Sequence, residues 1–502
     1  MNASPVVLGT VAAYLVVCLA VGLWPSKSQS SSVIGFVAGD RSLGLVLMYF
    51  ITGATIFSAF TFLGMPGQAY KQGAASFYIL SYGILGFVPF FFLGPRAARV
   101  GRVHGFVTQA EMIAHRFAAP RLAGVMALIS TIAFVPYIAL QMRGAGLILE
   151  SVSGGSIPSW AGAAVVYAIV LAYIAKSGLM GVGWTNVLQG LLMLSMAWGL
   201  GLYLPIHMYG GVGAMFERIA EARPEMLVAP GLAKPVPGIP QEPWAWSEYT
   251  SAILVSTLGF SCWPHLFMKA FTARDDRTIR RSVVLYPTFL IFQIPILLMG
   301  FAGVLYEKAP ADANQIVPFL LIEHGVPSLL IGLFCAGALA AAMGGDAIGH
   351  AAASIAVRDG LVRGLGVKLE GERERTWIRW TLVPVMLASY VVAVQWHQSL
   401  VWLLLFAYGP ITQFMPAVVA TLYSKRATAA GVLSGLVAGI AVTLTFDISS
   451  KLGTDLRPWP IHAGVFGLAA NVACLVLVSW ATRPADERRD EEFLRVASGK
   501  SG

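Results

Sequence analysis

Charged residues are scarce in this chain. Only 12% of its 502 residues are Asp, Glu, Lys or Arg, whereas 57% are hydrophobic. A soluble globular domain carries about 25% charged residues, so this composition excludes an ordinary water-soluble enzyme, and its hydrophobicity excludes a disordered chain. The four cysteines, Cys18, Cys262, Cys335 and Cys474, stand singly in hydrophobic runs without C-x-x-C spacing. They indicate small core residues rather than a disulfide framework or a metal site.

Motifs of hydrolytic and phosphate-binding enzymes are also lacking. The chain has no H-E-x-x-H zinc motif, no G-x-S-x-G nucleophile turn and no glycine-rich phosphate loop with its lysine. No pair of carboxylates shares one helix face. We therefore expect no enzymatic activity and no cofactor.

Long hydrophobic runs dominate what is present. A membrane-spanning helix needs about 20 mostly apolar residues, and backbone groups cannot stay unpaired in lipid. The sequence therefore predicts an all-α polytopic membrane protein with about 13 transmembrane helices. The predicted spans are Pro5–Trp24, Leu43–Pro66, Ala74–Phe92, Leu122–Leu147, Ser159–Ala175, Val187–Ile206, Ala252–Ala270, Val283–Leu305, Ser328–Ala356, Trp380–Val394, Leu400–Leu422, Ala429–Thr445 and His462–Ala481.

The basic residues predict the orientation of these spans. Cytoplasmic loops retain Lys and Arg, and an outside N-terminus with an inside C-terminus places 26 of the 34 basic residues on the cytoplasmic side. The net charge of +9 then reflects topology and attraction to anionic lipid headgroups, not binding of nucleic acid. We expect a multi-pass protein of a bacterial cytoplasmic membrane.

Two of the predicted spans contain helix-breaking residues in mid-membrane. The second span reads Gly53 to Thr61 and continues through Gly64-Met65-Pro66-Gly67, and the seventh contains Gly259 to His265 with a Trp-Pro-His sequence. Such breaks free backbone carbonyls and helix ends for ligands. Because the two lie five helices apart, they predict two five-helix repeats of inverted topology, with broken first and sixth core helices.

The breaks also divide the chain. We expect an extra helix and loop at 1–42, a first repeat at 43–208, an extracytoplasmic loop at 209–245, a second repeat at 246–423, two further helices at 424–482 and a cytoplasmic tail at 483–502. Thr108 and Glu111 form a Thr-x-x-Glu capping box, which predicts an interfacial helix from Thr108 to Phe117.

Several short motifs are spread over nearly the whole chain. They are Gly39-Asp40-Arg41-Ser42-Leu43, Ser58-Ala59, Gly64-x-Pro66-Gly67-x-Ala69-Tyr70, Trp184-Thr185-Asn186-x-x-Gln189, Trp263-Pro264-His265, Ala340-Ala341-Ala342-Met343, Tyr408-Gly409-Pro410 and Gln413-Phe414-Met415-Pro416. Together these motifs resemble the sodium:solute symporter family. The resemblance implies a core like that of amino-acid/sodium symporters and gradient-driven transport of a solute. The candidate substrate residues and Gln141-Met142-Arg143 are most similar to the branch that carries small monocarboxylates.

In that family a sodium ion is held by carbonyls of the broken first core helix and two hydroxyl side chains of core helix eight. Carried over by position, the carbonyls belong to Ala54 and Phe57. The family pattern Met-Ser-Thr is missing here, because Met343 is followed by Gly344 and Gly345. Loss of two oxygen donors weakens a site for a hard cation unless another group replaces them.

Asp346 is the candidate replacement. If the alignment is anchored on Asp346, Met343 and Gly344 fall in the hydroxyl slots, which still lack hydroxyls. A carboxylate in mid-span costs about 2.5–3.5 kcal/mol, so it indicates function. Asp346 either ligates sodium or binds the coupling proton with His350 as relay. Two alternatives are loss of coupling and a purely structural pair between Asp346 and His350, one turn apart.

A small solute is expected between the two breaks, near the middle of the membrane. An arginine there can hold a carboxylate bidentately, although Arg143 lies toward the outer end of its helix, where it can also reach Glu150 or the interface. Lys269 is expected at the cytoplasmic rim. The candidate binding residues are Thr55, Ser58, Thr61, Gln141, Arg143, Ser261, His265, Tyr408 and Gln413.

Taken together, the sequence predicts a symporter that imports a small organic solute, a short monocarboxylate or similar carboxylate, by alternating access. Its partners are the solute, sodium or protons, and the lipid bilayer. The alternatives are another solute, such as proline or pantothenate, and a membrane sensor or channel without coupled transport. No pattern indicates an oligomeric state.

Overall fold

Helices account for the regular structure of this protein. The computed structural model describes residues 4–24, 32–233, 240–308, 310, 312–395, 407–451, 453–484 and 486–499, without the side chains of Thr55 and Lys451. Within these ranges the strand-like pairings are two isolated bridges, Leu43 with Ala273 and Leu232 with Pro243. The predicted all-α architecture is confirmed.

The described residues of the N-terminal half form ten α-helices. The short 3₁₀ or π turns between them are η2 Gly39–Arg41, η3 Phe60–Gly64, η4 Gly73–Ser76 and, after α10, η5 Pro224–Met226. The α-helices are α1 Pro5–Leu23, α2 Val33–Ala38, α3 Leu45–Ile56, α4 Met65–Gln72, α5 Phe77–Gly86, α6 Val88–His104, α7 Gln109–Arg116, α8 Pro120–Val152, α9 Ser159–Tyr209 and α10 Val212–Ala222.

The described residues of the C-terminal half are also mainly helical. Its irregular turns are η6 Ala313–Gln315 and η7 Ala356–Gly364. Its α-helices are α11 Trp246–Cys262, α12 Pro264–Phe267, α13 Lys269–Thr272, α14 Asp276–Leu290, α15 Gln293–Ala302, α16 Ile316–Glu323, α17 Ser328–Met343, α18 Gly345–Ile355, α19 Glu372–Gln395, α21 Phe414–Tyr423, α22 Ala429–Lys451, α23 Ala463–Ala481 and α24 Glu487–Ser498.

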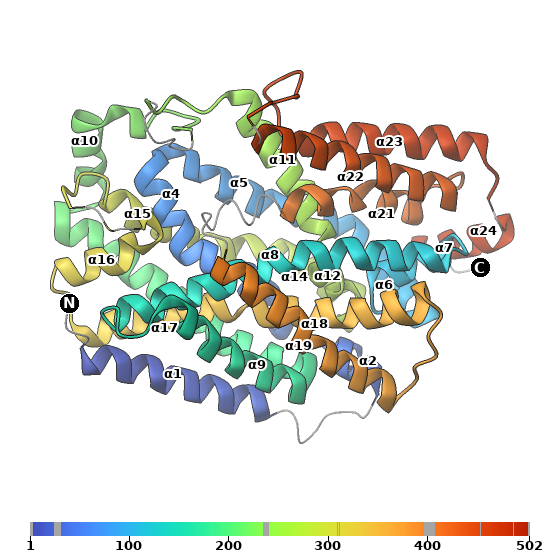
Figure 1. Ribbon diagram of the computed structural model, residues 1–502, viewed down its shortest axis with the longest axis horizontal. Helices are drawn as coiled ribbons and strands as arrows, with labels where there is room; N and C mark the ends of the chain where they lie inside the picture. The colour runs from blue at the N-terminus through green and yellow to red at the C-terminus, as the bar shows by residue number, and fades with distance from the viewer. Residues whose placement is uncertain are drawn as a thin grey trace.

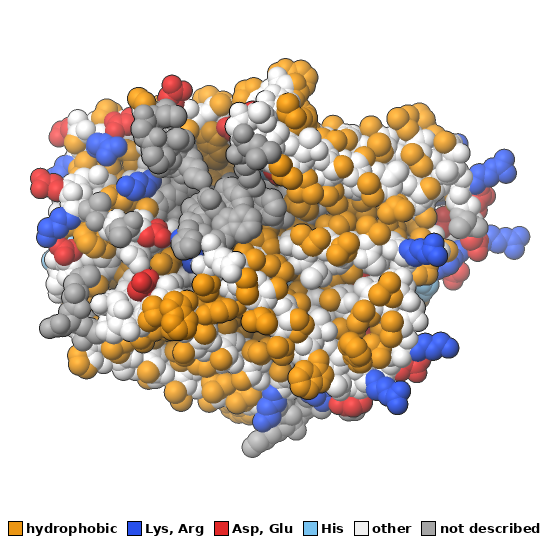
Figure 2. All heavy atoms as spheres, in the orientation of Figure 1, with side chains coloured by type: hydrophobic (Ala, Val, Ile, Leu, Met, Phe, Trp, Pro, Cys, Tyr) orange, Lys and Arg blue, Asp and Glu red, His pale blue; other side chains and the backbone are white. Residues whose placement is uncertain are grey.

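The long helices run along one axis of the molecule, between an end that carries α10 and α16 and an end that carries α7 and α24 (Figure 1). Charged side chains gather at these two ends, and the surface between them is mostly hydrophobic (Figure 2). Among the described residues, nine helical stretches are long and apolar enough to cross a membrane, and a bent pair, Trp246–Cys262 with Pro264–Thr272, makes ten. This distribution is that of a polytopic membrane protein.

The thirteen predicted spans coincide with helices wherever the structure describes them. The predicted span Leu400–Leu422 lies partly outside the described residues. Helix α9 covers two predicted spans, Ser159–Ala175 and Val187–Ile206, and Gly178 lies in the segment between them. Gly178 has φ 52° and ψ −146°, a conformation that side-chain-bearing residues rarely adopt, and an added Cβ would lie 2.7 Å from the carbonyl oxygen of Phe36. Glycine thus permits the turn that divides α9 in two.

Both predicted helix breaks are present. Helix α3 ends at Ile56, and Phe57 is extended with φ −76° and ψ 104° before the chain resumes a helix in η3. Helix α11 ends at Cys262, and α12 begins with Pro264, where the missing N–H of proline is tolerated. The two halves of this second span are bent by 49°. Each break leaves terminal backbone groups without an intrahelical partner.

The end of the molecule at α7 differs in two respects from the prediction. The capping box of Thr108 and Glu111 is confirmed, but α7 is buried within the protein rather than lying at an interface. The segment predicted as a tail forms helix α24, which packs against α6 and α7. An ion pair between Arg116 and Asp490 fixes it there.

Candidate functional site

The first helix break is held in place by a glutamine. Gln141, on α8, accepts a hydrogen bond from the backbone N–H of Ala59 at 2.8 Å through Oε1, whereas its Nε2 is buried with no partner among the described residues. The hydroxyl-bearing residues Ser58 and Thr61 are buried beside it. The structure thus brings three candidate binding residues to one break. Thr55 stands in the last turn of α3, and its side chain lies outside the description.

The second break is lined by aromatic rings. His265 is buried, both of its ring nitrogens lack a hydrogen-bond partner among the described residues, and its ring lies 5.7 Å from Phe134 and 5.9 Å from Tyr137. Trp263 packs edge-on against Tyr408 at 5.6 Å, so Tyr408 belongs to this region. Buried polar atoms without partners are rare in native proteins, so a cluster of them in a helix break indicates a ligand or water site.

Two candidate binding residues face elsewhere. Ser261 donates its hydroxyl to the carbonyl of Gly86 on α5, so it ties the break to a neighbouring helix. The Nε2 of Gln413 lies 3.3 Å from both Thr443 on α22 and the carbonyl of Gly464 on α23. Gln413 therefore connects the core to the last two helices, and the structure does not place it with the substrate candidates.

Core helix eight has a local irregularity at Gly344, which the sequence did not predict, although Gly344 keeps helical dihedral angles of φ −58° and ψ −10°. Helix α17 ends at Met343 and α18 begins at Gly345. A Cβ added at Gly344 would lie 3.3 Å from the carbonyl oxygens of both Ala54 and Phe57. The two carbonyls proposed for sodium thus converge on Gly344, and the glycine leaves space in front of them.

The neighbouring glycine has a different neighbour. A Cβ at Gly345 would collide with the hydroxyl of Tyr167, which donates a 2.8 Å hydrogen bond to the carbonyl of Ala342. Tyr167 on α9 therefore fills the place of the side chain that the family pattern has at this position. The sequence did not single out this tyrosine, because no local pattern links residues 175 positions apart.

Asp346 is fully buried and faces α9. Its Oδ2 accepts hydrogen bonds from Tyr173 at 2.7 Å and Thr185 at 3.3 Å, and its Oδ1 contacts the N–H of Ala347 at 2.5 Å. Residues two apart on a helix point about 200° apart, so Asp346 and Gly344 lie on nearly opposite sides of their helix. The prediction that Asp346 ligates sodium together with Ala54 and Phe57 therefore does not fit this arrangement.

Several polar groups surround this carboxylate. Thr185 belongs to the Trp184-Thr185-Asn186-x-x-Gln189 motif, whose members Asn186 and Gln189 are buried with amide oxygens that lack partners among the described residues. Tyr14 of α1 contacts the sulfur of Met343 at 3.7 Å, and Met343 is fully buried. The hydroxyls of Tyr173 and Thr185 thus contact Asp346 from α9, and the other polar groups named here lie on α9 and α1.

The predicted partner of Asp346 lies apart from it. No hydrogen bond or ion pair joins Asp346 to His350 within the described part of the chain; the His350 ring packs edge-on against Phe36 at 5.1 Å. The structural Asp346–His350 pair is therefore not present.

The position of Lys269 contradicts the expectation that this residue lies at the cytoplasmic rim. It is 2% exposed, not at a rim, and its ammonium group lies within electrostatic reach of Asp346, His265 and His350.

Arg143 lies near the outer part of the first break. Its side chain is 14% exposed and its Nη2 lies 3.8 Å from Oδ2 of Asp312, just before η6. The separation from Asp312 exceeds a hydrogen bond, so this is a loose ion pair at which a carboxylate ligand can compete.

Comparison with known proteins agrees with this architecture. Residues 36–439 match the sodium:solute symporter family. "Uncharacterized symporter YhjB" of Bacillus subtilis (strain 168) is 28% identical over 495 residues, covering 97% of this chain and 98% of the relative. The "Monocarboxylate transport permease protein" of Rhizobium johnstonii is 24% identical over 470 residues, covering 91% of this chain and 92% of the relative.

A solved structure shares the fold. A substrate-bound, outward-open Na⁺-coupled sialic acid symporter superposes with a TM-score of 0.77 at 19% identity, covering 97% of this chain and 100% of the other. The predicted architecture of two inverted five-helix repeats is confirmed. The chain therefore belongs to the sodium:solute symporter family of multi-pass membrane transporters.

Proposed function

We propose that this protein is a symporter that imports a small organic carboxylate together with a monovalent cation, by alternating access across a bacterial cytoplasmic membrane. Membership of the family supports coupled transport of a solute. The relative named as a monocarboxylate transport permease supports the substrate class. The distribution of basic residues supports an outside N-terminus and an inside C-terminus.

The observation that carries the proposal is the buried carboxylate of Asp346. It is 0% exposed and receives hydrogen bonds from the hydroxyls of Tyr173 and Thr185. Neutral hydroxyls satisfy its lone pairs but do not balance its charge, so a carboxylate in this position favours an arriving cation. In this proposal Asp346 is the coupling group, and the Ala54 and Phe57 carbonyls form a separate, weaker oxygen site beside Gly344.

Sodium is the first candidate for the cation. A hard cation binds oxygen ligands, and hydroxyl and amide oxygens of Thr185, Asn186 and Gln189 lie on the helix that faces Asp346. The proton is the second candidate, because a buried carboxylate can also be neutralised by protonation. The positive charge of Lys269 lies within reach of the carboxylate and opposes the binding of either cation.

The solute would lie between the breaks, where Gln141, His265 and Trp263 have buried nitrogen atoms without partners among the described residues. Arg143 would capture the carboxylate by replacing Asp312. Proline or pantothenate, which are named for other relatives, are alternative solutes that fit the same fold.

Uptake into proteoliposomes tests the proposed function. Purified protein is reconstituted, and a set of radiolabelled short carboxylates, proline and pantothenate is offered under an imposed sodium gradient and, separately, an imposed pH gradient. We expect saturable accumulation of a carboxylate under one gradient. Saturable counterflow without accumulation under either gradient would indicate a uniporter, and unsaturable flux would indicate a channel.

The role of Arg143 is tested with Arg143→Ala. Loss of the guanidinium should abolish uptake of an anionic solute while the melting temperature stays unchanged, because the pair with Asp312 is loose and partly exposed. Arg218→Ala, an exposed arginine over the Tyr209 ring at 5.8 Å, is the matched control. Unchanged uptake by Arg143→Ala removes this residue from the site.

A further inference from the structure

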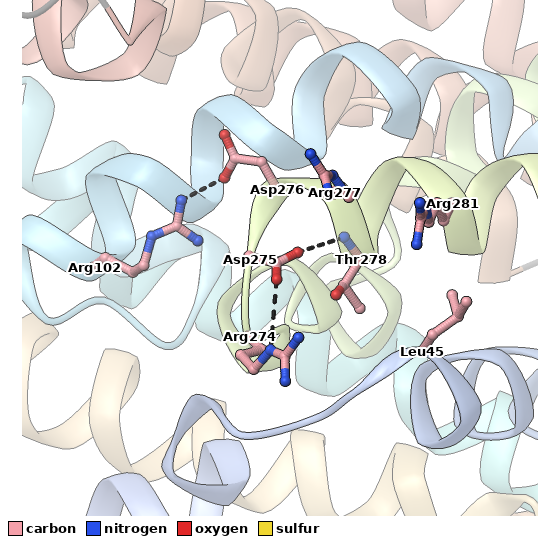
Figure 3. A pocket seen from close by; sticks show the side chains of 8 residues that line it. All are labelled: Leu45, Arg102, Arg274, Asp275, Asp276, Arg277, Thr278 and Arg281. Carbon is pink, nitrogen blue, oxygen red and sulfur yellow. Dashed lines mark hydrogen bonds and ion pairs between the residues drawn. The ribbon is translucent and has the colours of Figure 1, made fainter.

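A basic hollow opens where the second broken helix passes into α14. It has a volume of about 640 Å³ and lies between the start of α3, the end of α6 and the start of α14 (Figure 3). None of the residues discussed for transport lines it. The lining residues are Leu45, Arg102, Arg274, Asp275, Asp276, Arg277, Thr278 and Arg281.

The positive charge of this hollow is only partly balanced. Asp276 forms ion pairs with Arg99, at 2.6 Å, and Arg102. Asp275 caps α14 by accepting the N–H of Thr278 at 2.6 Å, and it lies 3.5 Å from Arg274.

Two arginines remain. Arg277 and Arg281 form no hydrogen bond or ion pair in the part of the chain that the structure describes, and Figure 3 draws no interaction for either. The hollow therefore presents two uncompensated guanidinium groups, which favour a phosphate or carboxylate ligand.

An apolar groove continues from the hollow along α14. The groove has a volume of about 410 Å³, is lined by Leu45, Arg280, Arg281, Val284 and Leu285, and shares Leu45 and Arg281 with the basic hollow. Val284 is 66% exposed. Arg277, Arg281 and Val284 follow one another at helical spacing, so one face of α14 passes from basic to aliphatic within about two turns.

The change from basic to aliphatic side chains along α14 matches a ligand with an anionic head and an apolar tail. We propose that the hollow and groove bind an anionic phospholipid, with its phosphodiester headgroup between Arg277 and Arg281 and an acyl chain along Val284 and Leu285. The expected topology places this end of α14 at the cytoplasmic leaflet, where basic pockets between helices bind anionic headgroups. A free phosphate would occupy the hollow but leave the groove empty.

The site adjoins both broken helices. Leu43, just before α3, donates its N–H to the carbonyl of Thr272 at 3.2 Å, and Arg274 donates its N–H to the carbonyl of Leu43 at 3.2 Å. These two bonds join the start of the first broken helix to the end of the second. A lipid held between Leu45 and the start of α14 therefore stabilises this junction.

Lipid binding is measured on the purified full-length protein by native mass spectrometry and by melting temperature in detergent with added phosphatidylglycerol, phosphatidylcholine or inorganic phosphate. The test variant is Arg277→Gln/Arg281→Gln. The control is Lys368→Gln/Arg373→Gln, which removes the same charge from exposed positions outside the hollow. Neither measurement depends on transport, so the result is independent of the proposed solute and coupling ion.

We expect wild-type protein to retain phosphatidylglycerol but not phosphatidylcholine, and the test variant to bind it at least about tenfold more weakly, since each basic residue near an anionic headgroup contributes about 1 kcal/mol. The control should bind as wild type. Equal weakening in both variants would mean diffuse surface attraction and would overturn the proposal. Stabilisation by inorganic phosphate alone to the same extent would show an anion site without a lipid. Val284→Gln should weaken phosphatidylglycerol binding without changing the response to phosphate.

Discussion

Two fully buried carboxylates in this protein have opposite surroundings. Glu111 and Asp346 are both 0% exposed. The Oε1 of Glu111 receives hydrogen bonds from Arg358 and Arg363, each at 2.7 Å, and its Oε2 receives the N–H of Val107 at 2.7 Å. Among the described residues, Asp346 has only hydroxyl and backbone partners, with the Lys269 ammonium at longer range.

The difference separates a structural charge from a functional one. Glu111 joins α7 to the end of core helix eight with its charge matched by guanidinium groups, so it has no need of a mobile ion. Asp346 is held in position by neutral donors, and under the proposed function it binds the coupling cation. Burial is common to both carboxylates, so it does not distinguish their roles; their contacting partners do.

The largest expected effect is on transport by Asp346→Asn. The amide keeps the shape and one acceptor oxygen, replaces the other oxygen by an NH₂ donor and removes the charge. Gradient-driven accumulation should therefore be lost completely while solute counterflow persists. Uptake and counterflow are measured in the same proteoliposomes. Asp455→Asn, at an exposed ion pair with Arg457, is the control. Full accumulation by Asp346→Asn would remove the distinction between the two carboxylates.

Glu111→Gln should reduce the stability of the protein, whereas Asp346→Asn should affect transport. Glu111→Gln leaves Arg358 and Arg363 facing a neutral amide in a buried site, and breaking a buried ion pair costs about 3–5 kcal/mol. The melting temperature should fall clearly, whereas Asp346→Asn should change it little. Glu221→Gln, exposed on α10, serves as the control for thermal unfolding. Equal melting temperatures for Glu111→Gln and wild type would contradict the structural role.

Gly344→Ser tests whether the carbonyl site can substitute for the carboxylate. The new Cβ would lie 3.2–3.3 Å from the oxygens of Ala341, Ala54 and Phe57, so a shift of a few tenths of an ångström admits the hydroxyl. One added oxygen ligand should raise the apparent affinity for sodium several-fold. Gly344→Ala adds the same Cβ without the oxygen. If both variants respond equally, the convergence of carbonyls on Gly344 has no role in cation binding.

The smallest expected effect is on the pH dependence of stability. Burial alone would raise the pKa of Glu111, but the guanidinium groups of Arg358 and Arg363 hold this pKa below its usual value. A lowered pKa means that the stabilisation by Glu111 is complete above the unfolded-state pKa of about 4.3 and is lost as the pH falls through the lower folded-state pKa. The difference in melting temperature between wild type and Glu111→Gln should therefore stay constant from about pH 8 to 5 and shrink only below about pH 4. A difference that declines already near neutral pH would contradict this sign.

Features local in the sequence were predicted well. The breaks at Phe57 and Trp263 follow from glycine, proline and small polar residues in mid-span, and the cap of α7 follows from Thr108 and Glu111. Each of these signals lies within a few residues of its effect. The repeat architecture then followed from the spacing of the two breaks.

Contacts between distant helices were not predicted. Tyr173 and Thr185 meet Asp346 across 173 and 161 residues, and Lys269 is buried because its helix, α13, packs against α6, α2 and η2. Hydrophobic patterning shows that a helix is in the membrane but not which neighbour each face meets. For the same reason the pair of Arg143 with Asp312, and the role of Gln413 in joining α22 and α23, appeared only in the structure.

The position of helix α1 suggests an order in which the surroundings of Asp346 assemble during synthesis. Its Tyr14 contacts Met343, 329 residues later in the chain, and Cys18 contacts Gln189 at 3.6 Å, so α1 lies against the helices that enclose Asp346. During synthesis α1 and α9 enter the membrane long before core helix eight. When core helix eight is synthesised, the helices that surround Asp346 are therefore already in the membrane. The carboxylate can be buried against them at once and is not left exposed to lipid.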